Sequence, residues 1–163
     1  FQGTKDWDDL HRAIKHLQAA ADATQEGHLD LPARYMGLGV FSNELFLRTH
    51  NLEDHETLLK NFQLSVAMTP LGHPALTFGH QNLAVTHSIK YQRSQDVDDL
   101  DAIVRYCTAA VAATSQGHFT LPSNFHTLAA SFTERFRQLG ISQDMENALI
   151  YSIKAVTGAP KGH

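Results

Sequence analysis

This 163-residue sequence contains a single cysteine, Cys107. One thiol excludes a disulfide within the chain and favours a reducing, intracellular compartment. The sequence also lacks an apolar run approaching the ~20 residues that cross a bilayer, and its first residues lack the charged and then apolar pattern of a signal peptide. We therefore expect a soluble, cytoplasmic protein.

Runs of basic residues are absent as well. The chain has 13 Lys and Arg against 17 Asp and Glu, a net charge of -4. Nucleic acids and anionic membranes attract basic patches, so neither is expected as a partner. Phe1-Gln2-Gly3 resembles the remnant of a protease-cleavable tag, so we expect the natural chain to start near Thr4 and residues 4–163 to form one domain.

The dipeptide Gly-His recurs every 45 residues, at Gly27-His28, Gly72-His73, Gly117-His118 and Gly162-His163. The same offset aligns Leu31, Leu76 and Leu121, Leu38, Leu83 and Leu128, and Thr24, Thr69 and Thr114. Such strict spacing is typical of a repeat protein. It predicts repeats at about 6–50, 51–95 and 96–140, followed by a partial repeat at 141–163.

Each repeat is expected to contain two helices. Leu10, Ile14, Leu17 and Ala21 follow the 3-4 spacing of one buried helical stripe. The predicted N-caps are Asp6, Asn51 and Asp96, with Ser142 in the partial repeat, and the acids Asp9, Asp54, Asp99 and Asp144 fall in the expected first turns. Capping and the helix dipole account for these acids without catalysis.

The loop around Gly-His is predicted to join the two helices of each repeat. Glycine is suited to a left-handed turn that ends the first helix, and the histidine would pack or hydrogen-bond across the loop. Pro32 and Pro122 are suited to the start of the second helix, which predicts extended backbone at Leu31 and Leu121 with both side chains on the core. Seven helices result, the last at about 144–156.

Catalytic and metal-binding patterns are not evident. Ligands of one zinc ion must lie within ~2.1 Å of it, whereas repeated histidines are spaced about 10 Å apart. His80 and His87 share a helix face but lack the glutamate of a metalloprotease motif. Cys107 belongs to an apolar stripe and is interpreted as a core residue. We expect no enzyme activity, cofactor or metal.

The segment from Leu31 to His73 resembles tetratricopeptide-like (TPR-like) repeats of large fungal, especially basidiomycete, proteins, which often carry a CHAT domain. The matching stretches are Leu38-Gly39, Arg48-Thr49, Leu52-Glu53-Asp54, Thr69-Pro70-Leu71-Gly72-His73, and also Ala13-Ile14 and Arg135-Phe136. Gly39 becomes Ala84 and Ala129 in later repeats, and His50 follows Thr49 where the family has glycine. The resemblance implies an all-α solenoid with a right-handed superhelix that serves as a protein-interaction scaffold within a larger protein.

The resemblance also implies that the second helix of each repeat lines a concave groove. The groove-facing positions are Ala33, Met36, Val40, Asn43 and Glu44; Phe78, Gln81, Val85, Ser88 and Ile89; and Ser123, His126, Ala130, Thr133 and Glu134. They include no basic residue, which argues against a clamp for a peptide carboxylate and favours a hydrophobic or amphipathic segment. The alternative is that these residues only pack between neighbouring helices.

The final helix carries an apolar stripe at Met145, Leu149, Ile150, Ile153 and Val156. The second helix of its repeat is missing from the sequence, so we expect a fragment of a longer array that can self-associate through this stripe. Two other functions remain open: a structural spacer or oligomerisation module, and a helical domain that binds a small molecule or metal through its histidines.

Overall fold

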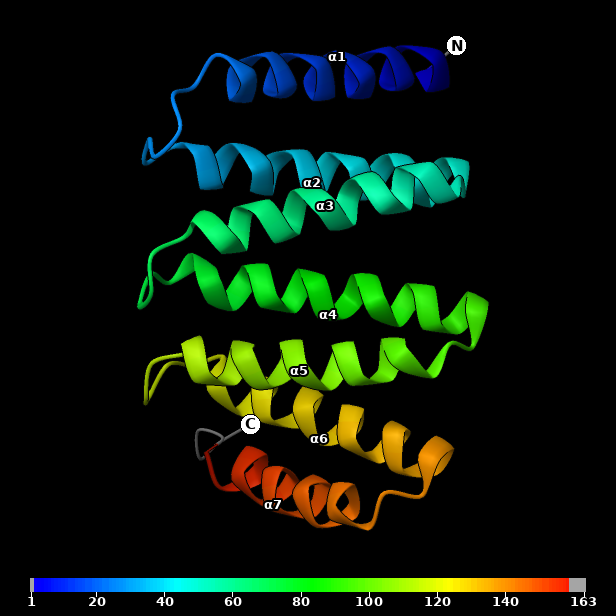
Figure 1. Ribbon diagram of the computed structural model, residues 1–163, viewed down its shortest axis with the longest axis vertical. Helices are drawn as coiled ribbons and strands as arrows, with labels where there is room; N and C mark the ends of the chain where they lie inside the picture. Colours follow the sequence, from blue (N-terminus) through cyan, green and yellow to red (C-terminus); the bar gives the residue numbers. More distant parts are fainter. Residues whose placement is uncertain (1, 159–163) are drawn as a thin grey trace. The chain divides into compact units, whose positions relative to one another are not determined.

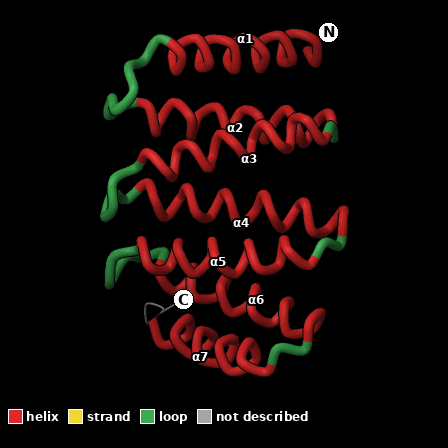
Figure 2. The backbone as a smooth tube through the Cα atoms, viewed as in Figure 1, coloured by secondary structure: helices red, strands yellow, loops and turns green. Residues whose placement is uncertain are grey.

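A computed structural model describes residues 2–158 of the chain, with side chains from Trp7 onward. The expected all-α class is confirmed: the described part folds into seven helices and has no strand (Figures 1 and 2). They are α1 (Gln2–Asp22), α2 (Leu31–Thr49), α3 (Leu52–Met68), α4 (Ala75–Ser94), α5 (Val97–Ala113), α6 (Leu121–Leu139) and α7 (Ser142–Gly158). None of these described helices combines the length and apolar character that crossing a membrane requires.

The chain divides into two compact units, Phe1–Pro70 and Leu71–His163. The first contains α1, α2 and α3, and the second contains α4 to α7. In each unit the helices joined by a two-residue connection pack as antiparallel hairpins, α2 with α3, α4 with α5, and α6 with α7 (Figure 1).

The short connections of these hairpins share one cap geometry. The preceding helix ends on a left-handed residue, His50 (φ 57°), Gln95 (φ 56°) or Gly140 (φ 69°). Each donates its backbone N–H to a carbonyl four residues earlier, at 2.8 Å. This bond satisfies a carbonyl that the helix end leaves open.

The predicted N-caps are confirmed at Asn51 and Asp96. Their side chains accept backbone N–H bonds from Glu53 (3.0 Å) and Asp98 (3.1 Å). The prediction at Ser142 is wrong because Ser142 is already the first residue of α7. Asp6 is also not a cap, because α1 already begins at Gln2. Asp9 therefore lies beyond the first turn.

The long connections contain the repeated glycines. Gly27, Gly72 and Gly117 are left-handed as predicted, with φ near 80°; Gly162 lies outside the described residues. They do not end helices, however, because α1, α3 and α5 end several residues earlier. Threonines mark those ends instead: the hydroxyls of Thr24, Thr69 and Thr114 donate to carbonyls four residues back at 2.5, 2.7 and 2.7 Å.

The residues before the repeated prolines are helical rather than extended. Leu31 and Leu121 are the first residues of α2 and α6, which corrects the predicted geometry. Their N–H groups donate to the carbonyls of His28 (3.1 Å) and His118 (2.9 Å), and both side chains are buried, as expected. Burial and hydrogen bonding here outweigh the steric preference of a residue that precedes proline.

Each compact unit has its own apolar core. In the first, Ala21 of α1 packs with Leu31 and Leu38 of α2. In the second, Ala84 of α4, Val104 and Cys107 of α5, and Leu128 and Phe132 of α6 form one buried cluster. The 3-4 stripes therefore face the core within each unit.

Candidate functional site

A groove of about 600 Å³ lies in the second unit, between α4 and α6 with α5 as its floor. Its lining residues are Gln81, Ala84, Val85, Ser88, Tyr91 and Gln92 from α4, Leu100, Ile103, Cys107 and Ala110 from α5, and Asn124, Thr127, Ala130, Ser131 and Glu134 from α6. Three helices therefore shape one site, which we call the α4–α6 groove.

Small side chains explain why the space stays open. Ala84 and Ser88 on α4 and Ala130 and Ser131 on α6 are all small and all line the groove. Because side chains of this size do not reach across the gap, α4 and α6 both pack on α5 without filling the space between them. The groove is thus produced by the choice of small residues on two helices.

One end of the α4–α6 groove is closed by hydrogen bonds. Gln81 Nε2 on α4 donates to Asn124 Oδ1 on α6 at 2.6 Å, and Asn124 Nδ2 donates to Thr114 Oγ1 at 2.9 Å. Thr77 Oγ1 lies 3.2 Å from the same Thr114 oxygen. This network satisfies the buried amide of Asn124 and links the two walls of the groove.

The groove carries little charge. Glu134 carries the one carboxylate among its lining residues, and it accepts hydrogen bonds from Gln138 Nε2 at 2.9 Å and Arg137 at 3.2 Å. Burial raises the pKa of the Cys107 thiol to about 11, partly offset by its hydrogen bond with Ser131. A thiol with this pKa is protonated at neutral pH and is a poor nucleophile.

The predicted groove residues fall into three groups. Gln81, Val85, Ser88, Ala130 and Glu134 line the α4–α6 groove, whereas Phe78, Ile89, His126, Thr133 and Ser123 do not. The remaining positions, Ala33, Met36, Val40, Asn43 and Glu44, lie on α2 in the first unit. Among these, Glu44 accepts a hydrogen bond from Arg48 Nε at 2.8 Å.

The α5 floor of the groove is not predicted by the sequence. The spacing predicts Cys107 as a core residue of an apolar stripe, and the TPR-like resemblance implies that only the second helix of each repeat lines the concave side. Tyr91, Asn124 and Ser131 also line the groove although their side chains are buried, and the sequence does not predict them there. Helical spacing predicts which residues face inward but does not show which inward positions border an open space.

The repeated acids do more than occupy first turns. Asp54, Asp99 and Asp144 lie there as predicted, but Asp99 and Asp144 are only 2% and 1% exposed. His87 Nδ1 and Lys90 Nζ lie 2.8 and 3.3 Å from Asp99 Oδ1. The acids therefore tie the two helices of a hairpin together, a role that capping alone does not describe.

His80 and His87 both stack on Tyr106 of α5. Their ring centroids lie 6.1 and 5.5 Å from that of Tyr106, and the guanidinium of Arg105 covers the same tyrosine at 4.9 Å. Burial lowers the pKa of His80. Both histidines therefore lie at the α4–α5 packing surface rather than in the groove.

The histidines of the Gly-His loops have a structural contact in common. Nδ1 of His28, His73 and His118 accepts the backbone N–H two residues later, at 3.1, 3.1 and 3.3 Å. The histidines therefore do form a hydrogen bond, but it spans only two residues within the loop; it satisfies a backbone amide at the start of the next helix. Within the described residues, no three His, Cys, Asp or Glu side chains gather as metal ligands would.

Comparison with known proteins adds no assignment. The sequence matches no protein-family model, and no curated protein or solved structure is similar enough to count as a match.

Proposed function

We propose that this chain is a protein–protein interaction module and that the α4–α6 groove holds a segment of a partner protein. The observation that carries the proposal is the groove itself, about 600 Å³ and lined largely by apolar and small neutral side chains. Its rim is accessible, since Val85 is 56% exposed. Apolar surface of this kind gains free energy when a partner's side chains cover it, at about 25 cal/mol per Å².

The strict 45-residue register supports the assignment to TPR-like repeats, in which stacked helix pairs present such grooves. On this proposal the repeats form a right-handed solenoid within a larger intracellular protein.

The partner segment is expected to be apolar or amphipathic. A peptide carboxylate would meet no basic group among the lining residues and would lie close to the acid Glu134. A neutral segment with a basic residue near Glu134 suits the groove better. The segment binds as a helix laid in the groove or as an extended chain.

A binding role is favoured over catalysis by the state of the reactive groups. Cys107 is buried with a raised pKa, and Nε2 of His87, the ring nitrogen that Asp99 leaves free, is buried as well. No histidine lines the α4–α6 groove, which weakens the alternative that histidines bind a small molecule there.

The test compares two phenylalanine substitutions on α6. A random-peptide display library is selected on the unmodified chain, and the affinity of an enriched peptide is measured by fluorescence anisotropy. Ala130→Phe fills the groove, whereas His126→Phe places the same ring one turn earlier, at an exposed position that does not line it. We expect Ala130→Phe to weaken binding about tenfold or more and His126→Phe to leave it unchanged.

Equal affinity of the peptide for all three proteins would place its binding site elsewhere and overturn the groove assignment. If the library yields no enriched peptide, the result supports the alternative that the chain is a structural spacer. A spacer would also keep every interaction when Val85 is replaced by alanine.

A further inference from the structure

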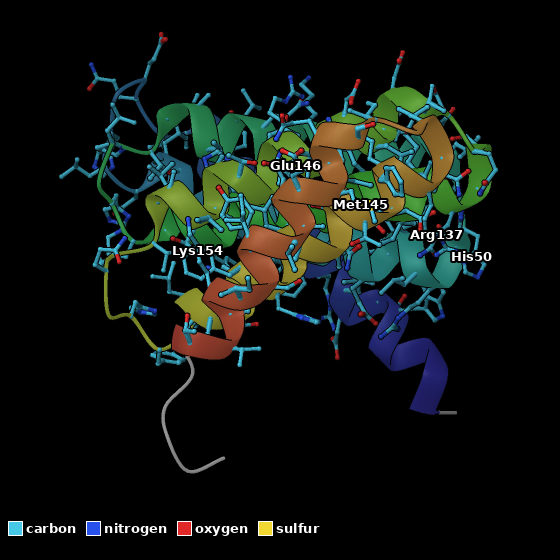
Figure 3. All side chains as sticks on the ribbon, turned by 90° about the horizontal axis from the view of Figure 1, so that it is seen from below. His50, Arg137, Met145, Glu146 and Lys154 are labelled. Carbon is cyan, nitrogen blue, oxygen red and sulfur yellow. The ribbon has the colours of Figure 1, made fainter. Side chains whose placement is uncertain are left out.

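The face of α7 that points away from α6 is apolar and uncovered by the described residues. Leu149 is 64% exposed and Val156 is 78% exposed, with Met145, Ile150 and Ile153 exposed beside them. The opposite face of α7 packs on α6 through Ala148 and Tyr151. Figure 3 shows α7 from below, with Met145 and Glu146 near its start and Lys154 toward its end.

The repeat register shows what covers the same face on other helices. Leu149 and Val156 come 45 residues after Val104 and Val111 of α5, which pack against the cluster that contains Leu128 of α6. The first unit repeats this interface independently. There Ile14 and Ala21 of α1, 90 residues before Val104 and Val111, pack with Leu31 and Leu38 of α2. In both units this face is covered by the next helix along the chain.

The covering helices share a pattern. Leucines occur at their first position and seven residues later, as Leu31 and Leu38 in α2 and as Leu121 and Leu128 in α6. In α6 a basic residue follows after seven more, Arg135, whose Nη1 donates to Asp101 Oδ1 of α5 at 2.8 Å. Glu146 on α7 occupies the register position of Asp101. Hence α7 presents both the apolar stripe and the acid that such a helix contacts.

We propose that the outer face of α7 is a docking surface for an amphipathic helix of another protein that carries the α6 pattern, two leucines seven residues apart followed by an arginine. The helix lies along Leu149 and Val156, and its arginine pairs with Glu146. This interaction is separate from the α4–α6 groove, because no residue of α7 lines that groove.

The probe is a synthetic, fluorescently labelled peptide with the sequence of residues 118–140, titrated into the full chain by anisotropy. We expect saturable binding that Leu149→Asp weakens about tenfold or more. Leu47→Asp, which places the same acid at an exposed apolar position of α2 that lines neither the groove nor the face of α7, is the matched control and should leave binding unchanged. Leu149 is exposed, so both variants should keep the circular dichroism spectrum of the unmodified chain.

A charge exchange tests the orientation. Glu146→Lys in the chain should lower the affinity for the peptide several-fold. A peptide with Arg135→Glu should restore the affinity for the Glu146→Lys chain but not increase it for the unmodified chain. Unchanged binding to Leu149→Asp would overturn the proposal, because it would mean that the peptide binds elsewhere or displaces α6. A dimer in sedimentation that Leu149→Asp abolishes, without peptide binding, would overturn it in favour of a second copy as the occupant.

Discussion

Arg135 of α6 holds the carboxylate of Asp144 with two parallel hydrogen bonds, from Nε to Oδ2 and from Nη2 to Oδ1, both at 2.7 Å. Asp144 is almost completely buried. The pairing raises the pKa of Arg135, with the hydrogen bond to Asp144 as the largest cause. This bidentate pair connects the two helices of the last hairpin at the start of α7.

Removing Arg135 should strongly destabilise the second unit. Arg135→Ala leaves Asp144 charged and buried without its partner, and we expect a loss of about 3–5 kcal/mol in the free energy of unfolding. Urea denaturation followed by circular dichroism measures this. Arg137→Ala is the control, since its pair with Glu134 is exposed and its loss should cost under ~1 kcal/mol. Similar losses in the two variants would contradict the structural role of the buried pair.

Gly39 on α2 is needed because Phe62 of α3 occupies the space of a side chain there. A Cβ at Gly39 would overlap the Phe62 ring. We expect Gly39→Ala to cost about 1–3 kcal/mol in the free energy of unfolding. At Gly37 a Cβ would meet only the end of the Leu17 side chain, at 3.3 Å, so Gly37→Ala on the same helix should be neutral or slightly stabilising.

The repeat register suggests how to relieve that overlap. In the second unit Ala84 and Cys107 occupy the positions of Gly39 and Phe62, so a larger residue on one helix accompanies a smaller one on the other. Phe62→Leu should therefore cost less in the Gly39→Ala background than in the unmodified chain, with a coupling of about 0.5–3 kcal/mol. Additive effects in a double-mutant cycle would show that the two positions do not share this space.

Acidification should destabilise the second unit through His80. Since burial lowers the pKa of His80 below 6.5, the unfolded chain takes up its proton at a higher pH than the folded chain. Stability is therefore retained above about pH 6.5 and lost as pH falls toward the folded-state pKa, by roughly 1.4 kcal/mol per unit of pKa difference. Unfolding free energies measured at several pH values test this.

The matched variant for this pH effect is His80→Phe. Phe125 occupies the same register position and packs on Tyr151, the counterpart of Tyr106, with centroids 5.8 Å apart. His80→Phe should keep the fold and flatten the pH dependence, while Phe125→His should steepen it. An unchanged slope in His80→Phe would show that His80 does not cause the pH dependence.

Cys107 should resist thiol reagents in the folded protein. Its pKa of about 11 against an ordinary 9.0 reduces the thiolate fraction about 100-fold at neutral pH, and burial slows access further. Ser152→Cys in a Cys107→Ala background places the thiol 45 residues later, at an exposed position of α7. Stopped-flow labelling should be at least ~100-fold faster in that variant. Comparable rates would contradict both the burial of the Cys107 thiol and its raised pKa.

Local chemistry was readable from the sequence alone. The 3-4 apolar stripes, the Asn51 and Asp96 caps and the left-handed glycines of the Gly-His loops each depend on residues close together in the chain. Two helix starts were predicted less well. No local signal marks the start of α1 at Gln2, and at Leu31 core packing overrides the extended backbone that a residue before proline prefers.

Tertiary structure decided the rest. Three features depend on the faces that separate helices present to one another. They are the hydrogen bond between Gln81 and Asn124, the place of Ile103 in the floor of the groove, and the pairing of Asp144 with Arg135. An apolar stripe indicates that a residue faces inward. It does not indicate how much space lies opposite that residue, because side chains many residues away determine that space. The 45-residue register by itself determined that contacts recur; the folded chain determined which of them bury a residue and which, on α7, leave it exposed.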